Sequence, residues 1–264
     1  MSASATSVPV IEANAARIPA LGLGTWALRG RTCARMVEEA LRLGYRHIDT
    51  AEMYENEREV GEGLRASGVP REQVFITTKV WSSNLAPDDL ARSARQSVAR
   101  LKVAQVDLLL IHWPNPRIPL GQTIPALCKA KTDGLARHIG VSNFDAGLVN
   151  EAVRLASEPL VNDQIEWHPF IDQSVARKAC HKHGISVTAY SPVAKGRAAN
   201  NKTLAAIGTR HGKTATQVAL RFLLQDGAIV IPRTSRSERL GENFAVFDFE
   251  LSAAEMSEIR KLAR

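Results

Sequence analysis

Eight short apolar runs, separated by stretches with helical spacing, are the feature of this chain that most limits its fold. Within several of these stretches, apolar residues recur at i, i+3, i+4 and i+7, as on one face of an amphipathic helix. The runs recur roughly every 25 to 40 residues, the length of one strand and its following helix. They are ALGLGTW (20–26), RHIDT (46–50), QVFITTK (73–79), VDLLLIH (106–112), RHIGVS (137–142), LVNDQIE (160–166), ISVTAY (185–190) and AIVIPR (228–233).

Many of these runs are apolar throughout, which is expected of parallel strands covered on both faces. Eight strand–helix units in 264 residues predict an α/β protein, a single (β/α)8 TIM barrel. We expect one domain over residues 1–264, because neither an internal repeat nor a linker is evident. The clearest predicted helices are CARMVEEALRLG (33–44), DDLARSARQSVARL (88–101), AGLVNEAVRLA (146–156), QSVARKACHKHG (173–184) and TATQVALRFLLQ (214–225).

The stretch VPVIEANAARIPAL (8–21) precedes the first unit and predicts a β-hairpin that closes the barrel bottom, with its turn at Glu12 to Ala15. Residues 1–7 are mostly small and polar, and a short disordered tail is expected there. This start lacks the apolar core of a signal peptide. No run reaches the roughly 18 apolar residues of a membrane span. A cytoplasmic protein without a membrane partner is therefore expected.

A doubly wound nucleotide-binding sheet is the weaker alternative. Its fingerprint is GxGxxG between a strand and a helix. The nearest candidate, Gly22-Leu23-Gly24, continues as Thr25-Trp26-Ala27 and lacks the third glycine.

Charge and cysteine usage exclude several functional classes. The net charge is +7, but Lys and Arg are scattered, which disfavours nucleic acid and favours a small anionic molecule. Cys33, Cys128 and Cys180 lie far apart without a CxxC pair, so neither a disulfide framework nor a zinc site is predicted. His181 and His183 are two apart on a helical stretch and point in different directions. We expect no metal, and a monomer, since no coiled-coil pattern is present.

Polar residues follow most of the apolar runs, where a barrel gathers its chemistry. Singly, each has an ordinary structural explanation, such as a turn-forming Asp, a solvated Lys or a hydrogen-bonded His. Together they would meet at one rim of the barrel. The set is Asp49, Lys79, His112, Ser142, Asn143, Gln164, Tyr190 and Arg233.

Tyr54, five residues after Asp49, suggests what this set can do. A free phenol has a pKa near 10, too high for an efficient proton donor at neutral pH. A nearby ammonium lowers that pKa. Lys79 could supply the ammonium, Asp49 could hold it as a buried ion pair, and His112 could orient a carbonyl oxygen. Such an acid needs a separate source of hydride or carbanion, hence a cofactor.

At this point the chain resembles the aldo-keto reductase family, over nearly its whole length from GLGTW (22–26) onward. Within the family it is most similar to the short bacterial 2,5-diketo-D-gluconate reductases. The stretches that carry the resemblance are HIDTAEMYENEREVGEGL, FITTKVW, DLLLIHWP, RHIGVSNF, NDQIEWHP, AYSPVAKG, GKTATQVALRFLLQ and IPRTSRSERLGEN.

The resemblance implies an NADPH-dependent enzyme that reduces small aldehydes and ketones to alcohols, for example 2,5-diketo-D-gluconate or methylglyoxal. It implies a catalytic tetrad of Asp49, Tyr54, Lys79 and His112. Tyr54 would donate the proton, Lys79 held by Asp49 would lower the pKa of Tyr54, and neutral His112 would orient the substrate oxygen.

The resemblance also implies how NADPH would lie extended across the rim. Relatives often have Lys-Ser where this chain has Arg233-Thr234; the charge is kept, and an arginine can hold a phosphate with two hydrogen bonds. Arg236 adds to this basic cluster. The implied cofactor residues are Gly24, Thr25 and Trp26 beside the nicotinamide, with Asp49; Ser142, Asn143 and Gln164 at its carboxamide; Tyr190 stacked under it; Ser191 at the pyrophosphate; Arg233, Thr234 and Arg239 at the 2′-phosphate; and Glu242 and Asn243 at the adenine.

Trp26, Trp81 and Trp113 follow strand-like runs and are expected to form apolar walls of a substrate pocket with Tyr54 and His112. Trp167 also follows a run, and core packing explains it equally well. Longer relatives have a C-terminal loop that closes over the substrate. The sequence ends with LSAAEMSEIRKLAR (251–264), so an open pocket with loose substrate choice is expected.

Two other functions stay open at this point. Lys79 could form a Schiff base with a carbonyl substrate, as in barrel aldolases. Alternatively, the chain could be a non-catalytic subunit that senses NADPH for a partner protein.

Overall fold

A parallel sheet of eight strands forms the centre of the computed structural model, which describes residues 8–263. Neighbouring strands follow one another in chain order from β3 to β10. Bridges from Leu21 to Val230 and from Gly24 to Arg233 join the two edges, so the sheet closes on itself. The predicted (β/α)8 barrel is confirmed. Its strands are β3 (Leu23–Gly24), β4 (His47–Asp49), β5 (Phe75–Val80), β6 (Val106–Ile111), β7 (Ala136–Ser142), β8 (Leu160–Glu166), β9 (Ser186–Tyr190) and β10 (Ile229–Val230).

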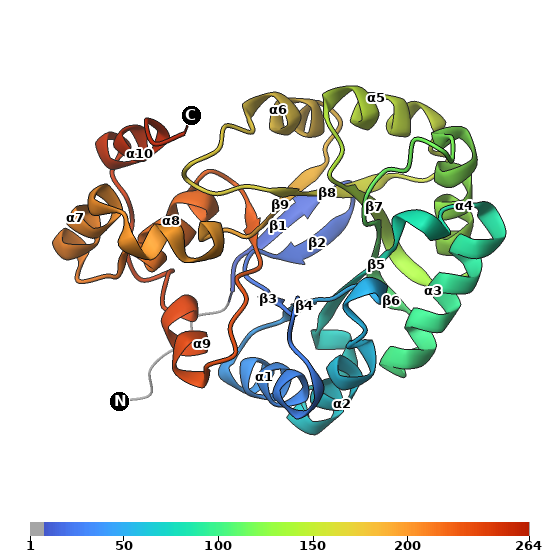
Figure 1. Ribbon diagram of the computed structural model, residues 1–264, viewed down its shortest axis with the longest axis horizontal. Helices are drawn as coiled ribbons and strands as arrows, with labels where there is room; N and C mark the ends of the chain where they lie inside the picture. Colours follow the sequence, from blue (N-terminus) through green and yellow to red (C-terminus); the bar gives the residue numbers. More distant parts are fainter. Residues whose placement is uncertain (1–7, 264) are drawn as a thin grey trace.

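Helices surround this ring of strands (Figure 1). Each predicted strand and helix is present, with ends that shift by a few residues. The α-helices are α1 (Gly30–Leu43), α2 (Glu57–Ser67), α3 (Pro87–Leu101), α4 (Leu120–Thr132), α5 (Ala146–Leu155), α6 (Ser174–Lys182), α7 (Lys202–His211), α8 (Ala215–Gln225), α9 (Ser237–Phe244) and α10 (Ala253–Arg260). Short 3₁₀ turns are η1 (Glu52–Tyr54), η2 (Arg71–Gln73), η3 (Ser82–Asn84) and η4 (Ala194–Asn200).

The main hydrophobic core lies between the strands and the helices. Outward-facing strand residues such as Leu109, Ile139 and Val141 are buried there with apolar helix residues such as Met36 and Leu220. Strands covered on both faces bury every residue, as β5 and β6 do. This explains why the sequence of β6, VDLLLI, is a nearly continuous apolar run. A rigid ring of this kind can fix side chains at its carboxyl rim.

The N-terminal hairpin consists of β1 (Val10–Ala13) and β2 (Ala16–Pro19), paired antiparallel. Its turn is Asn14-Ala15, with φ of 43° and 69°. The predicted turn at Glu12 to Ala15 is therefore too wide, because Glu12 and Ala13 already pair with the opposite strand. Two left-handed residues in succession match the twist of a two-residue hairpin.

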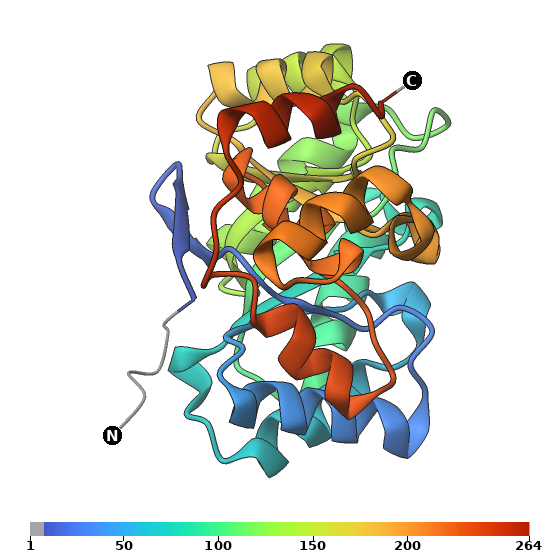
Figure 2. The same ribbon diagram turned by 90° about the vertical axis from the view of Figure 1, so that its left-hand side faces the viewer.

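The hairpin closes the end of the barrel where the strands begin, as predicted. Ala16 and Ile18 from β2 join Phe75, Leu108 and Val161 in a second apolar cluster inside the ring. Figure 1 places the hairpin across the middle of the ring, and Figure 2 shows it projecting from one end. The opposite end is left for the polar residues that follow the strands.

The disordered tail expected for residues 1–7 lies outside the described residues. Within residues 8–263, none of the helices combines the length and apolar character needed to cross a membrane.

Candidate active site

Asp49, Tyr54 and Lys79 meet at the carboxyl end of the strands. Asp49 ends β4 and Lys79 lies near the end of the neighbouring strand β5, and both are fully buried. Lys79 Nζ donates to Asp49 Oδ1 at 2.6 Å and to the Thr50 carbonyl at 2.8 Å. It also lies 3.4 Å from the Tyr54 hydroxyl. The ammonium thus stands between a carboxylate and a phenol, which is the arrangement the sequence predicts.

The turn η1 explains how Tyr54 returns to this ion pair. The chain leaves β4 and folds back within a few residues, where the Tyr54 N–H donates to the Ala51 carbonyl. Glu55 then takes a left-handed φ of 54°, which ends the turn before α2. The Tyr54 ring is 8% exposed and lies under Lys79, whose Nζ is 4.9 Å from the ring centroid.

Burial and charge act in opposite directions on these groups. Burial disfavours the Lys79 ammonium, but Asp49 and Tyr54 together outweigh it and raise the pKa of Lys79 above its ordinary value. For Tyr54, burial raises the pKa more than Lys79 lowers it, so the net pKa lies above the ordinary value. Lys79 acts in the predicted direction, but burial of the phenol outweighs it. Both groups are therefore protonated at neutral pH.

His112 follows β6 and faces the same site. Its ring lies edge-on to Tyr54, with centroids 5.6 Å apart, and edge-on to Trp81 at 5.1 Å. Burial, and next the nearby Lys79 ammonium, lower the pKa of His112 to about 3. The imidazole is therefore neutral at physiological pH. Its Nδ1 is buried and has no partner among residues 8–263.

A second group of predicted residues lies beside the ion pair, at the ends of β7, β8 and β9. Gln164 Nε2 donates to Asp49 Oδ2 at 2.7 Å. Ser142 Oγ donates to the Gln164 carbonyl at 2.6 Å. Asn143 Nδ2 donates to the His112 carbonyl at 2.9 Å, and the Tyr190 hydroxyl donates to Asn143 Oδ1 at 2.9 Å. The structure brings these residues together with the tetrad in one network.

This network suits a ligand that carries a primary amide. Gln164 has its Nε2 engaged by Asp49, while its Oε1 accepts no hydrogen bond from residues 8–263. An amide oxygen with a free lone pair can accept from the N–H of a carboxamide. The Tyr190 ring is only partly buried and offers an aromatic face nearby. These donors and acceptors fit the nicotinamide end of the predicted cofactor.

The predicted phosphate residues lie at the start of α9. Arg233, Arg236 and Arg239 are all exposed there. Thr234 is 4% exposed, and its hydroxyl accepts from the Arg236 N–H at 3.0 Å, shaping the turn that leads into the helix. Glu242 and the buried Asn243 follow on the same helix. Three guanidinium groups at a helix N-terminus suit a phosphate.

Gly24 and Thr25 support the site from β3. A Cβ at Gly24 would lie 2.6 Å from the Ile231 carbonyl oxygen, so the barrel closure requires glycine there. Thr25 is fully buried and its hydroxyl donates to the Asp49 carbonyl at 2.9 Å. Ser191 takes a left-handed φ of 49° just after β9 and is half-buried.

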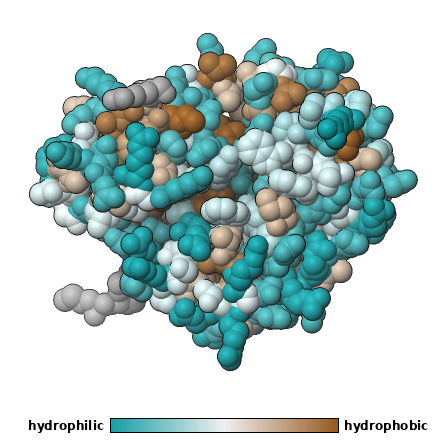
Figure 3. Space-filling model, viewed as in Figure 1, coloured by the Kyte–Doolittle hydropathy of each residue, from teal (hydrophilic) through white to brown (hydrophobic). Residues whose placement is uncertain are grey.

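The four tryptophans differ in their exposure. Trp26 is 56% exposed and Trp113 is 44% exposed, while Trp81 is partly buried against His112. The face opposite the hairpin is hydrophilic at its margin, with pale and brown residues toward its centre (Figure 3). Trp167 is buried, and the Arg177 guanidinium stacks 3.8 Å from its ring centroid, so it belongs to the packing.

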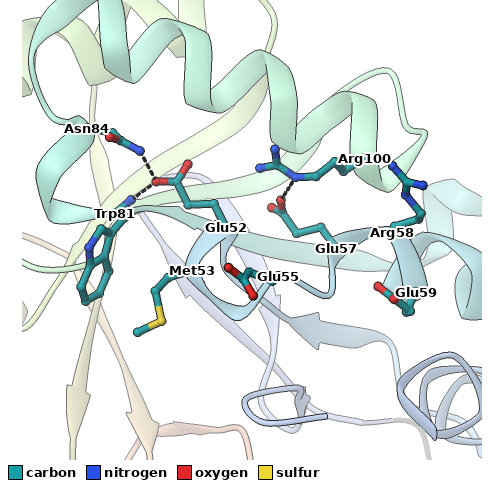
Figure 4. Close-up of a pocket in the computed structure, with 9 residues that line it drawn as sticks. All are labelled: Glu52, Met53, Glu55, Glu57, Arg58, Glu59, Trp81, Asn84 and Arg100. Carbon is teal, nitrogen blue, oxygen red and sulfur yellow. Dashed lines mark hydrogen bonds and ion pairs between the residues drawn. The ribbon is translucent and has the colours of Figure 1, made fainter. Parts of the chain in front are cut away.

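A surface pocket of about 640 Å³ opens beside Trp81, between η1, the start of α2 and the end of α3. Figure 4 shows the glutamates that line it, among them Glu52 and Glu55. The overall positive charge of the chain is thus not concentrated at this side of the rim. Sequence reasoning assigned no role to Glu52 or to Asn56, although both stand within two residues of Tyr54.

The fold and the site together define a class: a closed barrel whose rim holds a buried Lys79–Asp49 ion pair against the hydroxyl of Tyr54. A model of the Aldo/keto reductase family matches residues 20–264. The chain belongs to this family, which confirms the resemblance drawn from its motifs.

Relatives with known names cover almost all of the chain. It is 41% identical to the 9,11-endoperoxide prostaglandin H2 reductase of Trypanosoma cruzi over 94% of this chain and 89% of that protein. It is 38% identical to methylglyoxal reductase DkgB of Salmonella typhi, over 93% of each.

Solved structures agree with the fold. One, provisionally named a 2,5-diketo-D-gluconic acid reductase B, is 44% identical with a TM-score of 0.96, over 98% of this chain and 93% of that one. A Bombyx mori aldo-keto reductase in complex with NADP is 33% identical with a TM-score of 0.91, over 98% and 94% of the two chains.

Proposed function

We propose that the chain catalyses NADPH-dependent reduction of small aldehydes and ketones to alcohols. The observation that carries this proposal is the contact of Lys79 Nζ with both Asp49 Oδ1, at 2.6 Å, and the Tyr54 hydroxyl, at 3.4 Å. A buried ammonium beside a protonated phenol, at the rim of a barrel, is an acid placed to protonate an oxygen. General acid catalysis of this kind contributes about 10²–10⁴-fold to a rate.

Each residue of the tetrad has one task in this mechanism. Tyr54 donates its proton to the carbonyl oxygen as negative charge develops there. Lys79 stabilises the resulting phenolate, and Asp49 keeps the Lys79 ammonium charged and in place. Neutral His112 donates a hydrogen bond that orients the substrate oxygen, because a neutral ring carries one N–H. The partly exposed walls of Trp26 and Trp113 exclude water from one side of the substrate.

NADPH, when bound, supplies the hydride that reduces the carbonyl carbon. Ser142, Asn143 and Gln164 would hold its carboxamide, and the Tyr190 ring would support the nicotinamide. Ser191 and Gly24 would lie along its length, with Thr25 behind Asp49. Arg233, Thr234, Arg239, Glu242 and Asn243 would hold the adenosine end. The NADP complex of the Bombyx mori relative supports this choice of cofactor.

The substrate class rests on the relatives and on the pocket walls. Relatives named methylglyoxal reductase, glyoxal reductase and 2,5-diketo-D-gluconic acid reductase point to small dicarbonyl compounds. The Trp26 and Trp113 side chains stand half in solvent, which supports an open pocket with loose selection. We also propose that the protein acts as a cytoplasmic monomer.

The Schiff-base alternative is disfavoured by the state of Lys79. A lysine that attacks a carbonyl needs a neutral amine, usually through a lowered pKa. Here Asp49 and Tyr54 raise the pKa of Lys79 despite its burial. The ammonium therefore persists at neutral pH.

The test is NADPH oxidation by the full chain across a panel of aldehydes, ketones and keto acids. The proposal predicts turnover that requires NADPH and leaves no borohydride-trapped adduct on Lys79. Tight NADPH binding without turnover of any carbonyl would instead favour a sensing subunit. A trapped adduct without a need for NADPH would favour the Schiff base.

A further inference from the structure

The turn that carries Tyr54 is held at both ends by side chains outside the tetrad. Glu52 stands two residues before Tyr54 and Asn56 two residues after it. Glu52 is partly buried and Asn56 is fully buried. The polar atoms of both side chains form hydrogen bonds with neighbouring segments of the rim.

Glu52 connects η1 to the end of β5. Its Oε1 accepts from the Trp81 backbone N–H at 2.6 Å and from Asn84 Nδ2 at 2.9 Å. Figure 4 shows the Glu52 carboxylate reaching from η1 to both partners. Trp81 follows the strand that carries Lys79, and its indole packs edge-on against His112. Glu52 therefore fixes the Trp81 wall relative to the Tyr54 turn.

Asn56 connects the same turn to the loops that follow β3 and β4. Its Nδ2 donates to the Thr25 carbonyl at 2.9 Å and to the Leu28 carbonyl at 3.0 Å. Thr25 and Leu28 bracket the loop that carries Trp26. The Oδ1 of Asn56 accepts from Thr50 Oγ1 at 2.7 Å. The two N–H groups and the oxygen of the buried Asn56 side-chain amide are therefore all hydrogen-bonded.

Thr50 carries this connection to the ion pair. Its side chain is held by Asn56, and its carbonyl accepts from Lys79 Nζ at 2.8 Å. Asn56 therefore helps to position the Thr50 carbonyl, which accepts a hydrogen bond from the Lys79 ammonium. A displacement of about 1 Å at a reacting centre can cost a factor on the order of 10² in rate.

From these contacts we infer that Glu52 and Asn56 are positioning residues that fix Tyr54 between its ammonium partner and the two aromatic walls. Glu52 acts through Trp81, and Asn56 acts through Thr50 and the Trp26 loop. Neither touches the reacting atoms. The kinetic part of this inference rests on the proposed function, whereas the structural part does not.

Substitutions can separate geometry from charge. Glu52→Gln keeps an oxygen that accepts from the Trp81 N–H, and Glu52→Ala removes it. Asn56→Asp replaces a donor with an oxygen facing the Thr25 and Leu28 carbonyls, and Asn56→Ala removes all three bonds. Thr50→Val removes the Thr50 hydroxyl, and with it the hydrogen bond to Asn56 Oδ1, with little change in side-chain volume. Asn162→Ala is the matched control, because Asn162 is a fully buried amide bonded to Ser186 on the neighbouring strand.

The experiment combines amide hydrogen exchange with steady-state kinetics on the full chain. In Glu52→Ala, the Trp81 amide should exchange faster and KM for the carbonyl should rise about 10-fold, with NADPH binding unchanged. Glu52→Gln should match the wild type in both. Asn56→Ala, Asn56→Asp and Thr50→Val should lower kcat, by about 10- to 100-fold for the Asn56 variants. Asn162→Ala should lose stability but keep its kcat.

The results that would overturn the inference are equally specific. Unchanged Trp81 exchange in Glu52→Ala removes the role of Glu52. Wild-type kcat in Thr50→Val removes the path from Asn56 to Lys79, even if the Asn56 variants fail to fold. An equal loss of kcat in Asn162→Ala would show that kcat only follows stability. If the wild type reduces no carbonyl, the proposed function fails, while the Trp81 exchange data still decide whether Glu52 holds the turn.

Discussion

Gln164 donates a hydrogen bond from Nε2 to Asp49 Oδ2 at 2.7 Å, joining two residues that lie 115 positions apart in the chain. Asp49 Oδ1 is held by Lys79 at the same time. The residue expected at the cofactor carboxamide therefore also holds the carboxylate of the ion pair. Under the proposed function, cofactor binding and acid catalysis would therefore share one hydrogen-bond network.

Gln164→Glu should make catalysis depend on pH in a way that the wild type does not. Two carboxylates within hydrogen-bond distance cannot both ionise easily, so one pKa rises. When the new Glu is protonated it can donate to Asp49 as Gln164 does. The rate of reduction should therefore fall above that raised pKa and recover as the pH is lowered. The check is kcat as a function of pH for the variant and the wild type. The same pH profile in both would contradict the role of Gln164 at Asp49.

The wild-type enzyme should show no histidine-dependent change in rate near neutral pH. Burial and Lys79 lower the pKa of His112 to about 3, so the ring is neutral at neutral pH. The pKa values of Tyr54 and Lys79 both lie above their ordinary values. We expect kcat for reduction to be constant from about pH 5 to about pH 9. A fall in kcat as the pH drops through about 6.5, the ordinary histidine value, would show that His112 becomes charged in the active enzyme.

Much of the fold and of the candidate site can be predicted from sequence alone, because polar residues at the strand ends of a barrel gather at one rim. Apolar runs such as VDLLLIH predict strands buried on both faces, and the polar residue after each run then falls at one rim. This rule places His112 and Lys79 correctly. The same reasoning predicts the hairpin, although the predicted turn begins too early, at Glu12.

Other features depend on distances that sequence does not contain. One such feature is the direction of the net pKa shift of Tyr54. It depends on whether burial raises the pKa more than the Lys79 ammonium lowers it. The contacts of Asn56 are another. Its three partners lie in the loops that follow β3 and β4, and a lone asparagine before a helix is usually read as a cap.

Arg239→Ala should weaken the use of NADPH far more than the use of NADH. Arg239 is exposed on α9 beside Arg233 and Arg236, and only NADPH carries the 2′-phosphate that a guanidinium can bind. The check is KM for both cofactors in the variant. Arg154→Ala, which removes an arginine from the last turn of α5, serves as a control and should change neither value. Equal changes for NADPH and NADH would contradict the phosphate assignment.

Asp163→Asn should stabilise the fold increasingly as the pH rises. Asp163 is buried, its Oδ1 lacks a partner among residues 8–263, and burial raises its pKa from 3.8 to about 7. A carboxyl with a raised pKa stabilises the fold fully below its ordinary pKa, and this contribution is lost as the pH rises through about 7. A tenfold change in the affinity of a carboxylate for its proton corresponds to about 1.4 kcal/mol of free energy.

Urea unfolding of wild type and Asp163→Asn at a series of pH values measures this effect. The free energy of unfolding should be similar in the two proteins near pH 4 and diverge by a few kcal/mol by about pH 8, with the variant more stable. Parallel curves would show that Asp163 is ionised in the native protein or exposed to solvent.

The most direct test of the central claim is a comparison of Tyr54→Phe with the wild type. The variant keeps the ring under Lys79 and removes only the hydroxyl that lies 3.4 Å from Nζ. NADPH binding, measured by fluorescence, should be unchanged, while kcat for carbonyl reduction should fall by about 10²–10⁴-fold. Near-normal turnover by Tyr54→Phe with NADPH would contradict the claim that this phenol is the acid.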